Sequence, residues 1–242
     1  MTIWAIVPAA GTGSRMQADI PKQYLQIDNI AIVDISIAKL QSLQSLKKIV
    51  VMLHRDDLYW SDCRSQGCED VVARPGGENR YQSVLKGLEY LQPHAAAQDW
   101  VLVHDAVRPC VRVADIHTLC REIAEHPVGG LLAAPVGDTL KLSDPHLLVQ
   151  STVDRSALWS AFTPQIFRYA ILFEALNRAQ QEKCAVTDES GAVEKLGHKP
   201  RLVLGHTDNI KITRPEDLAM AQVILANQAE LANVKFQSRT NG

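Results

Sequence analysis

The sequence predicts an α/β protein built on a doubly wound, mostly parallel sheet from which a β-hairpin arm protrudes. Along most of the 242 residues, short apolar runs of strand type alternate with stretches of helical apolar spacing. This alternation is typical of a parallel sheet whose faces are covered by helices. A glycine-rich loop follows the first apolar run, at the strand end where such sheets bind ligands. Only the segment 136–158 breaks the alternation.

The predicted strands are short apolar runs. They span residues 3–7, 48–53, 71–73, 100–104, 130–135 and 201–204, with an edge-type strand at 209–213. Helices are expected where apolar residues recur at intervals of three and four, or where capping residues and an early proline mark a helix start. These helices span 30–43, a segment after Asn79, 116–123, 169–182, a segment from Thr187-Asp188-Glu189 to about Gly197, and a last helix with Pro215 in its first turn.

The segment 136–158 is predicted to be the hairpin arm. It alternates polar and apolar residues around a turn at Ser143-Asp144-Pro145. An exposed, half-apolar hairpin needs a cover, and a partner subunit is the usual one. A hairpin folded back on its own domain is the alternative. Because no repeat or linker is present, we expect a single domain over 1–242, with 136–158 used for dimerisation.

The composition excludes several classes of protein. A formal charge of −2 gives no general attraction to nucleic acid or to an anionic membrane. No apolar run approaches the roughly 20 residues that span a bilayer. The five cysteines and eight histidines show no metal-ligand spacing, so we expect a cytoplasmic protein with reduced thiols and no zinc site. Any anionic ligand must then be met by local Arg and Lys side chains.

The loop after the first strand, Pro8-Ala9-Ala10-Gly11-Thr12-Gly13-Ser14-Arg15-Met16, is predicted to surround a phosphate. Small residues let the backbone approach an anion closely, and Arg15 and Lys22 add positive charge. The loop is not a P-loop, which needs G-x-x-x-x-G-K-[ST]. Met16 also stands where dinucleotide and kinase loops have a third glycine. Taken alone, the residues fit a purely structural turn equally well.

Two other stretches are expected at the same edge of the sheet. One is Gly76-Gly77-Glu78-Asn79-Arg80, and the other begins at Asp105, directly after the strand 100–104. Mg²⁺ in proteins takes one or two carboxylates together with substrate phosphates. Asp105 opposite a phosphate-binding loop suits that role, although a strand-end Asp is an equally good helix cap.

Together these features resemble the nucleotidyltransferases that activate sugars and sugar alcohols. Within them they resemble the family of 2-C-methyl-D-erythritol 4-phosphate cytidylyltransferases of the non-mevalonate isoprenoid pathway. The first motif is PAAGTGSRM at 8–16 with PKQY at 21–24. The others are VHDAVRP at 103–109, APVGDT at 134–139, TVDR at 152–155, TPQ at 163–165, TDE at 187–189 and DNIKITRPED at 208–217. The resemblance extends from Ile6 to about Ala221 in the family's order.

The resemblance implies a Rossmann-like nucleotidyltransferase fold and a reaction of CTP with methylerythritol phosphate that releases pyrophosphate. The nucleophile would be the acceptor's own phosphate, whose second pKa is about 6, so no general base is needed. By the resemblance, Arg15 and Lys22 stabilise the transition state, and Arg155 and Lys211 position the acceptor. Asp105 would hold Mg²⁺ or another divalent cation.

The resemblance also assigns binding residues for each substrate. The nucleotide would contact Ala9, Ala10, Gly11, Gly77, Glu78, Arg80 and Ser83. The acceptor, a polyol phosphate, would contact Asp105, Ala106, Arg108, Thr139, Arg155, Thr163 and Lys211, with Thr139 and Arg155 reaching the neighbouring site of a homodimer from a swapped arm. Glu78 stands where the family usually has Asp, which puts a side-chain contact there in doubt, and Val107 replaces a more usual Ala.

Two other functions stay open at this point. One is transfer to another polyol phosphate, such as ribitol 5-phosphate, and the other is a non-catalytic nucleotide sensor on the same fold. Without the resemblance, Lys211 would be interpreted as an edge-strand lysine that discourages aggregation, and Arg155 as a solvated cation. Retention of Arg15, Lys22, Asp105 and Lys211 together favours an enzyme, because binding alone would not require all four.

Overall fold

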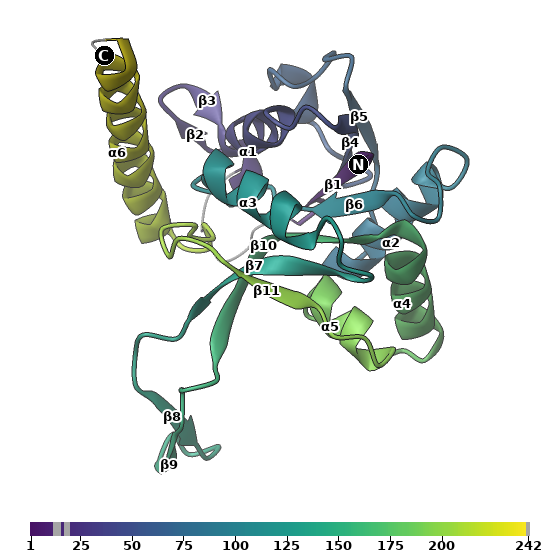
Figure 1. Cartoon of the computed structure of the whole chain (residues 1–242), viewed down its shortest axis with the longest axis vertical. Helices are drawn as coiled ribbons and strands as arrows, with labels where there is room; N and C mark the ends of the chain where they lie inside the picture. Colours follow the sequence, from purple (N-terminus) through teal and green to yellow (C-terminus); the bar gives the residue numbers. More distant parts are fainter. Residues whose placement is uncertain (12–15, 17–19, 241–242) are drawn as a thin grey trace.

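The computed structural model describes residues 1–11, 16 and 20–240, with side chains up to residue 229. Its centre is a seven-stranded sheet in the order β11-β7-β10-β6-β1-β4-β5 (Figure 1). The strands are β1 (Ile3–Ala9), β4 (Leu46–Leu53), β5 (Val71–Pro75), β6 (Trp100–Val103), β7 (Gly129–Pro135), β10 (Trp159–Arg168) and β11 (Arg201–Leu204). β10 runs antiparallel to both of its neighbours, whereas the other pairs are parallel. The predicted, mostly parallel sheet is therefore confirmed.

Helices cover both faces of this sheet. They are α1 (Ile32–Gln41), α2 (Arg80–Leu91), α3 (Val113–Ile123), α4 (Tyr169–Gln181), α5 (Glu189–Lys195) and α6 (Pro215–Thr240). Successive β1 side chains point to opposite faces. Val7 packs in a buried cluster with Ile37 of α1 and Ile116 of α3, while Ile6 packs in another with Leu88 of α2. The alternation of the sequence thus produces a doubly wound fold.

The predicted helix starts are confirmed in detail at two places that later matter for the site. The Asn79 side chain caps α2 by accepting a hydrogen bond from the Gln82 N–H at 3.1 Å, and Asp188 caps α5 by accepting one from the Gly191 N–H at 3.0 Å. Such side chains satisfy amide groups that have no partner inside the helix. Both helices therefore begin at positions fixed by their sequence.

Two segments differ from the predictions. β10 was not predicted as a strand, because Pro164 and Gln165 interrupt its apolar pattern; its register with β7 shifts between Ala161 and Gln165, as expected where a proline removes a donor. The predicted edge strand at 209–213 is wrong, because these residues adopt no strand. Individual hydrogen bonds hold them instead of a strand ladder, such as that from the Ile212 N–H to the Val107 carbonyl at 2.9 Å.

The remaining pieces are short. η2 (Lys22–Tyr24) and the hairpin of β2 (Gln26–Ile27) and β3 (Ile30–Ala31) follow the first loop, and η3 (Trp60–Asp62) lies between β4 and β5. Among the described residues, no helix combines the length and the apolar character needed to cross a membrane.

The hairpin arm is present where it was predicted. β8 (Leu140–Ser143) pairs antiparallel with β9 (Val149–Val153), and Asp144 closes the turn by accepting from the backbone N–H groups of His146 and Leu148, each at 2.9 Å. Figure 1 shows the arm extending away from the main sheet rather than folding back on it. Leu148 is 66% exposed and Val149 64% exposed, so these apolar side chains of the arm are largely uncovered by the described part of the chain.

Candidate active site

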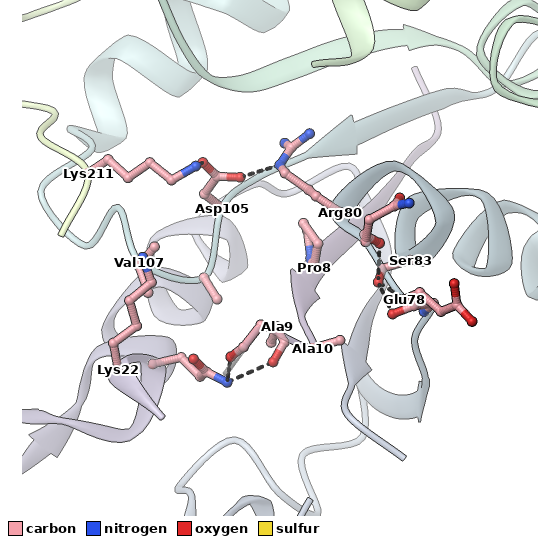
Figure 2. A pocket seen from close by; sticks show the side chains of 15 residues that line it. Pro8, Ala9, Ala10, Lys22, Glu78, Arg80, Ser83, Asp105, Val107 and Lys211 are labelled. Atoms are coloured by element: carbon pink, nitrogen blue, oxygen red, sulfur yellow. Dashed lines mark hydrogen bonds and ion pairs between the residues drawn. The ribbon is translucent and has the colours of Figure 1, made fainter. Parts of the chain in front are cut away.

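A cavity of about 290 Å³ opens at the carboxyl end of β1, between the first loop, the start of α2 and the loop after β6 (Figure 2). It brings together most of the predicted site residues, although they come from distant parts of the chain. The predicted residues that line it are Ala9, Ala10, Gly11, Lys22, Gly77, Glu78, Arg80, Ser83, Asp105, Ala106 and Lys211.

Other predicted site residues lie elsewhere. Arg15 lies outside the described residues. Thr139 and Arg155 are exposed on the arm and are not among the residues that line the cavity. Arg108 and Thr163 lie behind Asp105 rather than on the cavity wall, and Thr163 is only 4% exposed. One chain therefore supplies the nucleotide side of the predicted site, but not the arm residues.

Asp105 is the electrostatic centre of the cavity. Its Oδ1 lies 2.8 Å from Arg80 Nε, and its Oδ2 lies 2.8 Å from Lys211 Nζ and 3.6 Å from Arg108 Nε. Figure 2 shows the carboxylate between Arg80 and Lys211. Burial opposes ionisation of this carboxyl, but the three cations outweigh burial and hold its pKa well below the usual range. Asp105 is therefore a carboxylate at physiological pH.

A buried hydrogen-bond chain fixes the backbone at Asp105. His104 Nε2 lies 3.2 Å from the Arg108 carbonyl, which can only accept, so this nitrogen carries the proton. His104 Nδ1 then accepts from the Thr163 hydroxyl at 3.0 Å, and Thr163 Oγ1 accepts from the Asp105 N–H at 3.1 Å. Burial lowers the pKa of His104 to about 4, so the ring stays neutral. The Thr163 hydroxyl thus fixes the backbone N–H of Asp105.

The irregular segment after β11 brings Lys211 to the cavity. Arg108 donates to the Asn209 carbonyl at 2.7 Å, and the Asn209 amide donates to the Thr163 carbonyl at 2.9 Å. The bond from Ile212 N–H to Val107 ties the other side of Lys211 to the same loop. Regular strand pairing would not supply these anchors, which explains why the residues around Lys211 form a loop.

The loop before α2 is shaped by tight packing and by one hydroxyl. A Cβ added to Gly77 would lie 2.5 Å from Gln82 Cβ, and one added to Gly76 would lie 2.8 Å from Ala10 Cβ. Ser83 Oγ accepts from the Gly77 N–H and donates to the Asn79 carbonyl, both at 3.0 Å. Ser83 thus holds the loop in shape.

The Glu78 side chain at the rim of this loop is exposed. In Figure 2 its carboxylate lies on the far side of Ser83 from Asp105. Glu78 therefore lines the cavity at its exposed rim.

Sequence reasoning missed two buried residues that build the site. Gln23 is 3% exposed, and its amide donates to the carbonyls of Ala9 at 2.8 Å and Gly11 at 3.1 Å. It therefore fixes the backbone where the chain leaves β1. Glu189 is fully buried and binds the Arg80 guanidinium through both oxygens. Gln23 lies in the motif PKQY and Glu189 in the motif TDE, both noted in the sequence. The presence of a polar side chain in each motif was the signal that could have identified these two residues.

The donor set fits a divalent cation that is held mainly by its substrate. Within the part of the chain that the structure describes, no three His, Cys, Asp or Glu side chains gather into a metal-binding group. Mg²⁺ characteristically keeps waters and takes one or two carboxylates plus substrate phosphates. Of the two carboxylates among the described residues that line the cavity, Glu78 is exposed, whereas Asp105 is buried and ionised and therefore suits this role.

Comparison with known proteins identifies close relatives over nearly the whole chain. The family model described as 2-C-methyl-D-erythritol 4-phosphate cytidylyltransferase matches residues 3–227. The protein of that name from Pseudomonas entomophila is 49% identical over 216 residues, covering 89% of this chain and 92% of the relative. The one from Hahella chejuensis is 44% identical over 223 residues, covering 92% of each.

A solved structure agrees with these relatives. The crystal structure of the Francisella tularensis 2-C-methyl-D-erythritol 4-phosphate cytidylyltransferase superposes with a TM-score of 0.81 at 33% sequence identity. The match covers 93% of this chain and 100% of that one. The family-model match over residues 3–227 spans the strands of the sheet, the residues that line the cavity and the loop that carries Lys211.

Proposed function

Because the chain belongs to the 2-C-methyl-D-erythritol 4-phosphate cytidylyltransferase family, it is a nucleotidyltransferase, and we propose that it transfers CMP from CTP to 2-C-methyl-D-erythritol 4-phosphate. The products are 4-diphosphocytidyl-2-C-methyl-D-erythritol and pyrophosphate, in the non-mevalonate pathway to isoprenoid precursors. The observation that carries the proposal is the cavity itself, which Gly11 and Gly77 line together with Asp105, Lys22 and Lys211. A nucleoside triphosphate and a second phosphate both need such cations.

The chemistry asked of these residues is mainly electrostatic. An anionic acceptor phosphate attacks the α-phosphorus of CTP, the new P–O bond forms, and the bond to pyrophosphate breaks. Cations aimed at the developing charge lower the barrier, because a preformed site needs no reorganisation during reaction. We assign this role to Lys22, together with Arg15 from the family resemblance. Lys22 Nζ lies 3.0 Å from the Ile212 carbonyl, which ties it to the loop of Lys211.

The charges around Asp105 support an anionic ligand. Arg80, Arg108 and Lys211 contribute three positive charges against the two negative charges of Asp105 and Glu189. One positive charge is therefore in excess, before Lys22 is counted. A ligand phosphate can draw Lys211 from Asp105 without leaving the carboxylate unpaired, since Arg80 keeps its own contact. Lys211 is thereby suited to bind the acceptor phosphate.

Asp105 would be the protein ligand of Mg²⁺ or another divalent cation bound with CTP. Such an ion neutralises triphosphate charge and favours departure of pyrophosphate. The chain's own contribution is to keep Asp105 ionised and fixed, through Arg80 on one side and the Thr163 hydroxyl behind its backbone.

The acceptor side of the site is completed in this proposal by a homodimer. The arm carries Thr139 and Arg155, both exposed and away from this chain's cavity. Its uncovered apolar side chains are the kind of surface that a second subunit buries. Exchange of arms between two copies would bring Thr139 and Arg155 to the partner's cavity. The cytoplasm is the proposed location, since all five cysteines are unpaired.

The direct test is product formation. The purified protein is incubated with CTP, Mg²⁺ and 2-C-methyl-D-erythritol 4-phosphate, and the reaction is followed by ³¹P NMR. We expect the acceptor's monoester signal to give way to two coupled diphosphate signals, together with free pyrophosphate. Absence of the coupled signals with a folded protein would contradict the proposed reaction.

A further inference from the structure

We propose that Glu189 is a positioning residue for this reaction, acting through Arg80 on Asp105. The inference rests on the proposed function, because its readout is the turnover of that site. Glu189 does not line the cavity and is 0% exposed, so it does not meet a substrate. Glu189 belongs to the TDE motif, and the reaction described above assigns no role to the residues of this motif.

Glu189, Arg80 and Asp105 form a chain of ion pairs in which negative and positive charges alternate. Arg80 donates from its two terminal nitrogens to Glu189, at 2.6 and 3.0 Å, and from Nε to Asp105 Oδ1 at 2.8 Å. The planar guanidinium is therefore held at two edges, and it cannot rotate without breaking one of them. Burial disfavours the charged form of Arg80, but Glu189 and then Asp105 raise its pKa instead. Arg80 thus carries a fixed positive charge at the cavity wall.

Glu189 is itself held rigidly at the start of α5. Gln165 of β10 accepts from the Ser190 N–H at 2.8 Å and donates to Asp188 at 2.9 Å. Asp188 caps the same helix through the Gly191 N–H. These bonds join the buried strand β10 to α5, so the carboxylate that grips Arg80 has little freedom of its own.

The consequence concerns the orientation of Asp105. Without Glu189, the terminal nitrogens of Arg80 would be left without their carboxylate, and Asp105 would be the nearest replacement. A guanidinium that pairs with Asp105 through two nitrogens would compete with Lys211 for the same carboxylate. Glu189 prevents this by occupying one edge of Arg80. The acidic residue therefore keeps Asp105 available to Lys211 and to the nucleotide-bound cation.

The test compares Glu189→Gln with Glu194→Gln, a matched control at an exposed position of the same helix. Glutamine keeps the shape and one acceptor but removes the charge that anchors Arg80. We expect kcat/KM of Glu189→Gln to fall about 10- to 100-fold, the range typical of residues that orient a ligand-bearing side chain. The control should stay within about threefold of the original. Thermal unfolding should show that both variants are folded at the assay temperature.

A double-variant comparison separates a role of Glu189 in positioning Arg80 from a role in stabilising the fold alone. In an Arg80→Met background, adding Glu189→Gln should restore thermal stability, because it removes an orphaned buried charge, while kcat/KM should not fall further. Full activity of folded Glu189→Gln, or a further tenfold loss in the Arg80→Met background, would overturn the inference. If Glu189→Gln alone does not fold, the Arg80→Met pair decides the question. An inactive original protein would instead contradict the proposed function.

Discussion

Lys211 Nζ lies 2.8 Å from Asp105 Oδ2, although Lys211 comes from an irregular loop near the end of the chain and Asp105 from the end of a central strand. The contact joins the predicted acceptor side of the site to its predicted metal ligand. In the ligand-free chain these two groups partly neutralise each other. Substrate binding then exchanges one ionic contact for another, which avoids leaving a buried charge unpaired.

Lys22→Ala tests the cation that we assign to the transition state. Removing one such group typically lowers kcat about 10²- to 10³-fold, and we expect that loss in steady-state assays with a much smaller change in the KM for CTP. Lys199→Ala, in an exposed loop after α5, is the control and should leave kcat unchanged. A Lys22→Ala kcat within threefold of the original would remove Lys22 from the mechanism.

The first loop offers a test of close approach by the nucleotide. A Cβ on Gly11 would meet no atom of the described residues within 4 Å, whereas a Cβ on Gly77 would meet Gln82 at 2.5 Å. Gly11→Ala should therefore leave the unfolding free energy nearly unchanged and weaken CTP binding in calorimetry, because no described residue fills that space and we expect the bound nucleotide to occupy it. Gly77→Ala should weaken both. Unchanged CTP affinity in Gly11→Ala would place the nucleotide away from Gly11.

The buried His104 predicts a specific pH dependence of stability. In the unfolded chain its pKa is about 6.5, whereas burial lowers the folded value to about 4. Because the unfolded state alone takes up a proton between these values, the unfolding free energy falls as pH drops from about 7 to about 4, and this contribution changes no further below pH 4. Between pH 7.5 and pH 5 the loss is about 2 kcal/mol.

Urea denaturation at both pH values checks this contribution. His104→Gln should lose about 2 kcal/mol of the pH dependence, since glutamine has no proton to gain. His117→Gln, at an exposed position of α3, serves as the control. If His104→Gln keeps the pH dependence of the original protein, the titrating group lies elsewhere.

Arg155 is expected to act in the partner's site. Lys22→Ala and Arg155→Ala should each be inactive, but subunit exchange in an equal mixture makes about half of the dimers mixed. With swapped arms, a mixed dimer has one site with both Lys22 and Arg155 intact and one with neither. The mixture should therefore recover about a quarter of the original activity. Arg155 acting within its own chain would give no recovery despite confirmed exchange.

Much of the fold could be predicted because its signals are local. Buried apolar runs, and caps such as Asn79 and Asp188, act over a few residues and leave a clear pattern. β10 was missed because its place between β6 and β7 is set by long-range pairing, which tolerates Pro164 inside a strand. The loop around Lys211 was mistaken for a strand for a similar reason. Its apolar residues alternate, but its hydrogen bonds go to side chains and to Val107.

The site was predicted less completely than the fold. Residues at strand ends and glycine turns, such as Gly77 and Asp105, could be found from their position in the pattern. Gln23 and Glu189 were missed although both lie in noted motifs, because a buried polar side chain is recognised only once its partner is known. Gln23 binds Ala9, 14 residues before it, and Glu189 binds Arg80, 109 residues before it. The family resemblance placed Arg155 and Thr139 near an active site. The pattern of a single chain does not say whether that site belongs to the same chain or to a partner subunit.

The most direct measurement of the central claim is acceptor choice. Pyrophosphate release from CTP is followed with 2-C-methyl-D-erythritol 4-phosphate, with ribitol 5-phosphate, and with no acceptor. We expect kcat/KM for the first acceptor to exceed that for ribitol 5-phosphate by at least 10²-fold, the discrimination that a site with paired polar contacts can reach, and no release without an acceptor. Preference for ribitol 5-phosphate, or CTP binding without release in any mixture, would contradict the account.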